Sequence, residues 1–196
     1  MLCPYPECGP LAQSRSYSQS ALAGSSRDER AWVRGAQAGS VSDLEALFEA
    51  HWPRAYRAAY LVVGEGGAAE DIAQEAFLAA VRALDRFDRR RPFGPWLHRI
   101  VVNRAIDFAR ARALRAEVTG VPEHPDPSTG SSLGRGELSD ELMAGLHALT
   151  PDHRAVVVLR YLLDYTPGEI AALLDVPRGT VNSRLRRALD ELKELL

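Results

Sequence analysis

Apolar residues recur at intervals of three and four along most of the chain, which is the period of an amphipathic α-helix. The clearest N-terminal example begins at Ser42 or Asp43 and is interrupted by Pro53, a residue that can kink a helix. Its apolar stripe consists of Leu44, Leu47, Phe48, Trp52, Ala55, Tyr56, Ala59, Tyr60 and Val63. We expect a shorter helix over residues 31–38, before this one. The glycines within 64–67 are expected to end the longer helix.

Two more helices are expected in the N-terminal half, separated by a basic loop over residues 85–92. The first covers residues 68–84, and its apolar face consists of Ala69, Ile72, Ala73, Ala76, Phe77, Ala80 and Leu84. The second begins with Gly94 as N-cap and Pro95 in the first turn, where the missing N–H of proline is not needed. Its core face consists of Leu97, Ile100, Val101, Ala105 and Phe108.

The C-terminal part of the chain predicts four helices, of which the first two cover residues 138–149 and 151–162. Thr166, Pro167 and Glu169 form a capping-box pattern that starts the third helix, and Pro177 starts the fourth after a short turn. Two short helices joined in this way are typical of a helix-turn-helix, whose second helix lies in the DNA major groove. For this segment alone, a solvated C-terminal helix of another kind of bundle is the alternative.

Composition marks the boundaries between these parts. Residues 1–27 have no apolar period and are expected to form a tail with little fixed structure. Residues 116–136 are rich in Pro, Gly, Ser and Thr, a composition typical of a linker. The sequence therefore predicts an all-α fold with two small helical domains, over 28–115 and 137–196, joined by a flexible linker over 116–136.

Charge is unevenly distributed, although the formal net charge is only -2. Residues 82–115 contain ten arginines and three aspartates, a net charge of +7, which indicates a nucleic-acid partner. No stretch approaches the roughly 18 apolar residues that span a bilayer, and no signal-peptide pattern opens the chain, so we expect a cytoplasmic protein without membrane insertion. Cys3 and Cys8 have no nearby His or third Cys, so no zinc site is expected.

Two outward helix faces are candidate binding surfaces. The first carries Asp71, Gln74, Glu75, Leu78 and Arg82. It is either a solvated face or a protein-docking face. The second carries Trp96, Arg99, Asn103, Asp107 and Arg110. Cations beside aromatic and amide groups suit single-stranded nucleic acid, but Trp96 is alternatively a packing residue. Asp71 and Glu75 lie one turn apart on the first face, but two carboxylates without a pocket or a metal-binding histidine do not form a catalytic site, so we do not expect an enzyme.

Three motifs occur in order along the chain: DIAQEAF at 71–77, PWLHRIVVNRAIDFARAR at 95–112 and EIAALLDVPRGTVNSRLRRAL at 169–189. Together they resemble the extracytoplasmic-function (ECF) subfamily of the sigma-70 family of bacterial RNA polymerase sigma factors. The resemblance spans roughly residues 41–196. It implies two promoter-binding domains, called sigma-2 and sigma-4, and no metal or other cofactor. The alternative is a helix-turn-helix transcriptional regulator with an N-terminal helical sensing or dimerisation domain.

The resemblance also implies partners and residue roles. Core RNA polymerase is bound through the clamp helices of its largest catalytic subunit and the flap of its second-largest subunit, and an anti-sigma factor is a possible further partner. The residues that match the clamp-docking face are Asp71, Gln74, Glu75 and Leu78. Those that match the surface for binding and melting the minus-ten promoter element are Arg86, Arg89, Arg90, Arg91, Trp96, Arg99, Asn103 and Arg110. Those that match the minus-thirty-five surface are Arg178, Gly179, Thr180, Asn182, Ser183, Arg186 and Arg187.

Overall fold

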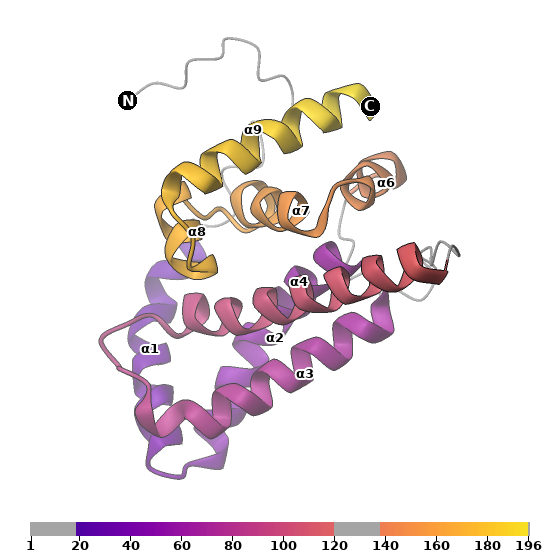
Figure 1. The fold of residues 1–196 in the computed structure, drawn as a ribbon. Coiled ribbons are helices and arrows are strands. Elements are labelled where there is room, and N and C mark those ends of the chain that lie inside the picture. Colours follow the sequence, from indigo (N-terminus) through magenta and orange to yellow (C-terminus); the bar gives the residue numbers. More distant parts are fainter. Residues whose placement is uncertain (1–18, 120–137, 196) are drawn as a thin grey trace.

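The structure, a computed structural model, describes residues 19–119 and 138–195 as two packed helical bundles (Figure 1). The N-terminal bundle contains α1 (Gln19–Gln37), α2 (Val41–Val63), α3 (Gly66–Ala83), the 3-10 turn η2 (Leu84–Arg86) and α4 (Phe93–Thr119). The C-terminal bundle contains α6 (Asp140–Ala148), α7 (Pro151–Val157), the π-helical turn η4 (Val158–Leu162), α8 (Pro167–Leu174) and α9 (Arg178–Leu195). No strand occurs within these two ranges, and the all-α prediction is confirmed.

Helix α2 is the centre of the N-terminal bundle, and α1, α3 and α4 all pack against it. Its start is fixed by the Ser40 side chain, which accepts a hydrogen bond from the Asp43 N–H (3.3 Å). Its end is fixed by Gly64, whose φ of 80° is in the left-handed region that favours glycine. Pro53 lies inside the helix, so the predicted apolar stripe continues through it. Leu47 and Tyr60 on this stripe are fully buried.

The first helix is much longer than the sequence pattern predicted. Helix α1 spans Gln19–Gln37, so the helix expected over 31–38 is present but its predicted start was wrong. Residues 19–27 are helical although we assigned them to the tail. Contacts from the second half of α1 to the rest of the bundle explain the stability of this helix better than its own hydrophobic pattern does. The Glu29 carboxylate accepts a hydrogen bond from the Phe93 N–H (2.9 Å) and pairs with His51 Nε2 (3.0 Å). Cys3 and Cys8 lie outside the described residues.

The same Glu29 contact changes the start of α4. We expected Gly94 to cap this helix, but α4 begins at Phe93, where Glu29 satisfies an N–H that a helix leaves unpaired. Its other end lies at Thr119, so residues 116–119 of the predicted linker are helical. The remainder of that linker lies outside the described residues.

The C-terminal bundle follows the predicted order of helices. Thr166 and Glu169 form the expected capping box at the start of α8, with the Thr166 N–H donating to Glu169 Oε2 at 2.8 Å. The segment expected as one helix over 151–162 is an α-helix only to Val157 and continues as the π-helical η4. Helix α9 buries the face Val181, Leu185, Ala188 and Leu192.

The two bundles lie directly against each other, which the sequence pattern did not predict. Helices α7 and α8 of the C-terminal bundle pack on α4, and α6, α7 and η4 also contact α2 (Figure 1). Buried apolar residues of both bundles form one continuous core.

Candidate nucleic-acid and protein interfaces

The outward face of α3 presents the predicted docking residues together. Asp71, Gln74 and Glu75 are exposed, and Leu78 is 56% exposed one turn further along. Gln74 Nε2 donates to Oε1 of Glu70 (3.2 Å), an exposed residue one turn earlier on α3. The Glu70 carboxylate therefore lies beside the predicted docking residues. The opposite side of α3, including Ile72 and Phe77, is buried against the bundle. The amphipathic pattern of α3 therefore places a mixed acidic, amide and leucine surface in solvent.

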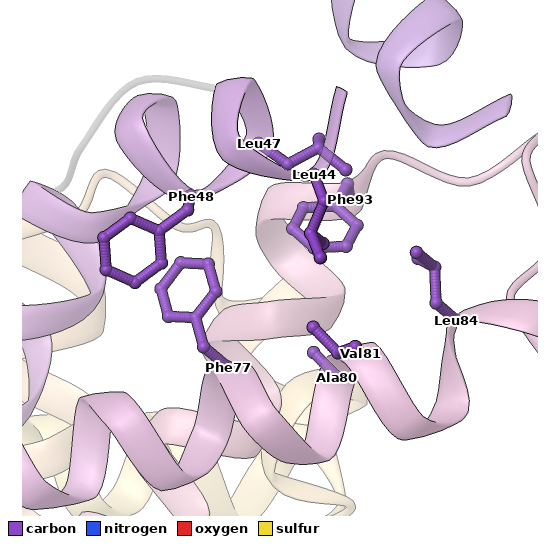
Figure 2. Close-up of a pocket in the computed structure, with 8 residues that line it drawn as sticks. All are labelled: Leu44, Leu47, Phe48, Phe77, Ala80, Val81, Leu84 and Phe93. Carbon is purple, nitrogen blue, oxygen red and sulfur yellow. The ribbon is translucent and has the colours of Figure 1, made fainter. Parts of the chain in front are cut away.

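This face continues into an apolar surface that the sequence pattern did not reveal. Val81, one turn after Leu78, is 41% exposed, and so is Phe48 on α2, which we had expected in the core. Both line a small pocket, in which Phe48 lies against Phe77 with ring centroids 4.9 Å apart (Figure 2). The other lining residues are Leu44, Leu47, Ala80, Leu84 and Phe93. An exposed apolar side chain beside a polar rim is typical of a protein interface.

The basic loop before α4 presents its arginines to solvent. Arg86 ends the turn η2, and Arg89, Arg90 and Arg91 follow it; all four are exposed. The loop is shaped by Asp88, whose Oδ1 accepts a hydrogen bond from the Arg90 N–H (3.0 Å). The structure therefore concentrates cationic groups at the N-terminal end of α4.

Trp96 is a packing residue in this structure, which favours the alternative that we left open. Its ring centroid lies 4.6 Å from that of Phe87 and 5.5 Å from that of Phe93. Only part of the side chain remains exposed. Arg99, one turn along, is exposed, and Asn103 is half-buried. The arginine loop, the edge of Trp96 and these two polar residues thus lie near one end of α4.

Arg110 is separated from this group. It follows Trp96 by 14 residues on α4, which at a rise of 1.5 Å per residue is about 21 Å. Its Nη2 donates to Oδ1 of Asp152 in the C-terminal bundle (2.8 Å), and its Nε donates to Oδ2 (3.1 Å). The structure thus assigns Arg110 to the contact between the bundles, and no sequence signal pointed to its partner Asp152.

The predicted minus-thirty-five residues lie together on the outer surface of α9. Arg178, Gly179, Asn182, Arg186 and Arg187 are exposed, and Thr180 and Ser183 are half-buried. The Ser183 hydroxyl donates to the Thr180 carbonyl (2.9 Å), which orients it near the start of the helix. One further arginine, Arg184, turns inward and pairs with Asp152 Oδ1 (2.9 Å).

Two buried polar groups lie where the bundles meet, and neither was among the residues predicted from the sequence. Arg154 of α7 is 6% exposed, and its Nη1 donates to the Val62 carbonyl at the end of α2 (2.5 Å). His98 of α4 shares a 2.7 Å hydrogen bond with the Tyr165 hydroxyl. Burial lowers the pKa of His98 to about 3 and raises that of Tyr165 to about 12. The His98 imidazole and the Tyr165 hydroxyl are therefore both neutral near pH 7.

Within the described residues, no helix has the length and apolar character needed to cross a bilayer. The same part of the chain has no cluster of three or more His, Cys, Asp or Glu residues arranged to hold a metal ion.

Comparisons with known proteins match both bundles to one family. Residues 47–115 match sigma-70 region 2, and residues 139–192 match sigma-70 region 4. Sigma factor SigE of Mycolicibacterium smegmatis is 34% identical over 163 residues, covering 80% of this chain and 63% of that protein. SigW of Bacillus subtilis is 30% identical over 183 residues, covering 84% of this chain and 94% of that protein. Both are described as ECF RNA polymerase sigma factors.

A solved structure has a similar fold. CnrH, in complex with the cytosolic domain of CnrY, superposes with a TM-score of 0.63 at 28% identity, covering 86% of this chain and 96% of CnrH. The match to region 2 sets aside the alternative of an ordinary helix-turn-helix regulator, because that class does not require this domain. Sigma factors are non-enzymatic subunits of the polymerase holoenzyme. The chain belongs to the ECF subfamily of the sigma-70 family, and it is an RNA polymerase sigma factor that directs transcription initiation.

Proposed function

We propose that the outward face of α3 docks on the clamp helices of the largest catalytic subunit of core polymerase. The observation that supports this role is the exposed set of Asp71, Gln74, Glu75 and Leu78, which points away from the bundle core and continues into Val81. Carboxylates and an amide supply charge complementarity and orientation, while the leucine and valine supply apolar area. A partner helix with basic residues around an apolar residue fits this surface.

The end of α4 near the basic loop is the proposed minus-ten surface. Strand opening requires a surface with higher affinity for single-stranded than for duplex DNA, because binding shifts an equilibrium only by differential affinity. Arg86, Arg89, Arg90 and Arg91 hold the phosphate backbone. Arg99 and Asn103 are the proposed contacts to an unstacked base, whose extrusion costs a few kcal/mol. Trp96 supports this surface by packing, and Arg110 joins it only when its contact with Asp152 is broken.

The outer surface of α9 is the proposed minus-thirty-five surface. Arg178 and Arg187 are suited to phosphates, while Asn182, Ser183 and Arg186 are suited to base edges in the major groove. Gly179 and Thr180 at the helix start allow close approach of the backbone amides to a phosphate. This surface positions polymerase upstream of the opened strand.

The remaining partners are proposals of the same kind. We place the protein in the cytoplasm, where core polymerase acts, and propose that the C-terminal bundle contacts the flap of the second-largest subunit. The similarity to CnrH, which was solved with a bound protein domain, supports an anti-sigma factor as a further partner.

The proposal is tested by the affinity of fluorescently labelled protein for core polymerase. The double variant Asp71→Ala/Gln74→Ala should bind at least tenfold more weakly, because it removes a carboxylate and an amide from the centre of the docking face. Asp190→Ala/Glu194→Ala, which removes two exposed carboxylates from α9, is the matched control and should bind like wild type. Equal affinities for the two double variants would reject α3 as the polymerase-docking face.

A further inference from the structure

Helix α1 precedes the part of the chain that matches sigma-70 region 2, but it contacts the basic loop before α4 directly. At the end of α1, Gln37 Nε2 donates to the carbonyls of Leu84 (2.8 Å) and Phe87 (3.1 Å). About two turns earlier, the Glu29 carboxylate accepts a hydrogen bond from the Phe93 N–H (2.9 Å). The basic loop is therefore held against α1 at both of its ends (Figure 1).

Arginines occur on both the loop and the helix between these two points of contact. Residues 89–91 of the loop are all arginine and are all exposed. On α1, Arg30 and Arg34 lie between Glu29 and Gln37 and are also exposed. Glu29 and Gln37 are eight residues apart, which is about 12 Å of helix at a rise of 1.5 Å per residue. Three arginines of the loop and two of α1 therefore occupy the same short stretch.

The positions of Arg30 and Arg34 on α1 place both at one margin of this contact. The inward side of the helix carries Glu29, Val33 and Gln37, which recur every four residues, and Val33 is buried. Arg30 follows Glu29, and Arg34 follows Val33, by one residue, which is a rotation of about 100°. The two arginines therefore share one flank of α1 and lie one turn apart.

The guanidinium groups of this flank are not used by the fold. Among the side chains that the structure describes, neither Arg30 nor Arg34 forms a salt bridge or a hydrogen bond. By contrast, Arg110, Arg112 and Arg184 each pair with a carboxylate. Like charges four residues apart slightly destabilise a helix. The Arg30 and Arg34 pair therefore contributes nothing to folding and is suited to an anionic ligand.

Nearby carboxylates do not neutralise this surface. Asp28 lies two residues before Arg30, a rotation of about 200°, so it points to the other side of α1. The loop contains Asp85 and Asp88, and Asp88 Oδ1 already accepts a hydrogen bond from a backbone N–H of the loop (3.0 Å). Against these two carboxylates, residues 86–91 supply four arginines and α1 supplies two, a net charge of +4. The combined surface is therefore strongly cationic.

We propose that Arg30 and Arg34 of α1 bind phosphates of the opened promoter strand, so that α1 and the basic loop form one surface for the DNA backbone. Arginines that contact only phosphates position a strand without reading its sequence. Helix α1 therefore adds affinity that is independent of sequence, next to the residues of α4 that are proposed to contact a base. The choice of the opened strand as the ligand rests on the proposed minus-ten role of the loop.

The salt dependence of DNA binding measures the number of these contacts. Holoenzyme is titrated by fluorescence anisotropy against a labelled single DNA strand that spans the minus-ten element of a promoter found by run-off transcription. Each phosphate contact to a single strand contributes about 0.7 to the slope of log K against log salt concentration. Arg30→Gln/Arg34→Gln should therefore reduce the slope by about 1.4, and each single variant by about 0.7. Arg30→Lys/Arg34→Lys keeps both charges and should retain the wild-type slope.

Lys193→Gln is the matched control, because it removes one exposed cation from the last turn of α9. Its slope should equal that of wild type, and all variants should keep the wild-type circular dichroism spectrum and core affinity. An unchanged slope in Arg30→Gln/Arg34→Gln, or an equal reduction in Lys193→Gln, would overturn phosphate binding by α1.

Arg89→Gln on the same strand separates this inference from the proposed role of the loop. A slope reduced by Arg89→Gln but not by Arg30→Gln/Arg34→Gln would overturn the role of α1 alone. A slope reduced only by the α1 variants would support phosphate binding by α1 and reject the loop as its neighbouring DNA contact.

Discussion

The hydrogen bond between His98 and Tyr165 predicts that mild acid weakens the packing of the two bundles against each other. Burial, with the positive charges of Arg54 and His51 on α2, lowers the pKa of His98 from 6.5 to about 3 while the bundles are packed. When the bundles separate, the imidazole regains solvent, so its pKa returns toward 6.5 and it binds the proton more tightly. The packing is therefore fully favoured above pH 6.5 and is weakened progressively as the pH falls toward 3.

The size of the effect follows from the two pKa values. At 1.36 kcal/mol per pH unit below 6.5, the packing of the bundles loses about 1.4 kcal/mol at pH 5.5 and about 2.7 kcal/mol at pH 4.5. The equilibrium between packed and separated bundles therefore shifts toward separation roughly tenfold per unit. Separation is measured between pH 7.5 and 5.0 from the distance between spin labels at Ala111→Cys on α4 and Asp190→Cys on α9, two exposed positions, in a Cys3→Ser/Cys8→Ser background.

The matched variant is His98→Gln, which keeps a polar side chain but cannot titrate in this range. Two histidine–carboxylate pairs lie near the contact: His51 pairs with Glu29 in the N-terminal bundle, and His153 pairs with Glu191 in the C-terminal bundle. Each pair lies within one bundle, so its contribution to bundle separation should be small. The His98→Gln protein should keep the label distance of neutral pH down to pH 5.0. Acid-induced separation of equal size in this variant would refute the assignment to His98.

Two further predictions concern the C-terminal bundle. Arg186→Ala should lower discrimination between a promoter and its minus-thirty-five base variants by about 1–3 kcal/mol with core affinity unchanged, measured by competition binding of holoenzyme; an unchanged ratio would remove Arg186 from the base-contacting set. Thr166→Ala should lower the free energy of unfolding by about 1 kcal/mol in urea titrations, because the Glu169 N–H loses its acceptor at 3.3 Å; no change in the midpoint would show that the capping box contributes nothing.

Local sequence patterns predicted the helices well where caps and stripes coincide. The Thr166 and Glu169 capping box appears as expected, and the apolar face of α9 is buried as its spacing predicted. These features depend on neighbours within one or two turns, so they can be inferred from sequence alone. Residues 19–27 of α1 have no such pattern, because α1 is anchored later, through Glu29.

Contacts between the bundles could not be predicted from the sequence, for a different reason. Arg154 binds backbone carbonyls, which every residue carries, so no complementary residue in the sequence identifies its partner. Asp152 and Arg110 are 42 residues apart and have no fixed spacing. A usable signal did exist in α4, where His98, Val102 and Ala109 form a second buried stripe. This second stripe was hard to recognise in the sequence because it lies beside the core face that includes Leu97 and Val101, and the two merge into one apolar run.

The most direct test of the whole account is run-off transcription from genomic fragments with core polymerase. Wild-type protein should produce transcripts from a limited set of promoters. At those promoters Arg89→Ala/Arg90→Ala/Arg91→Ala should retain holoenzyme formation but lose most of the transcript, because strand opening lacks its phosphate contacts. The same transcripts appearing without the protein would contradict its role as the specificity subunit. Wild-type transcript levels from the triple variant would contradict the melting surface on which the account depends.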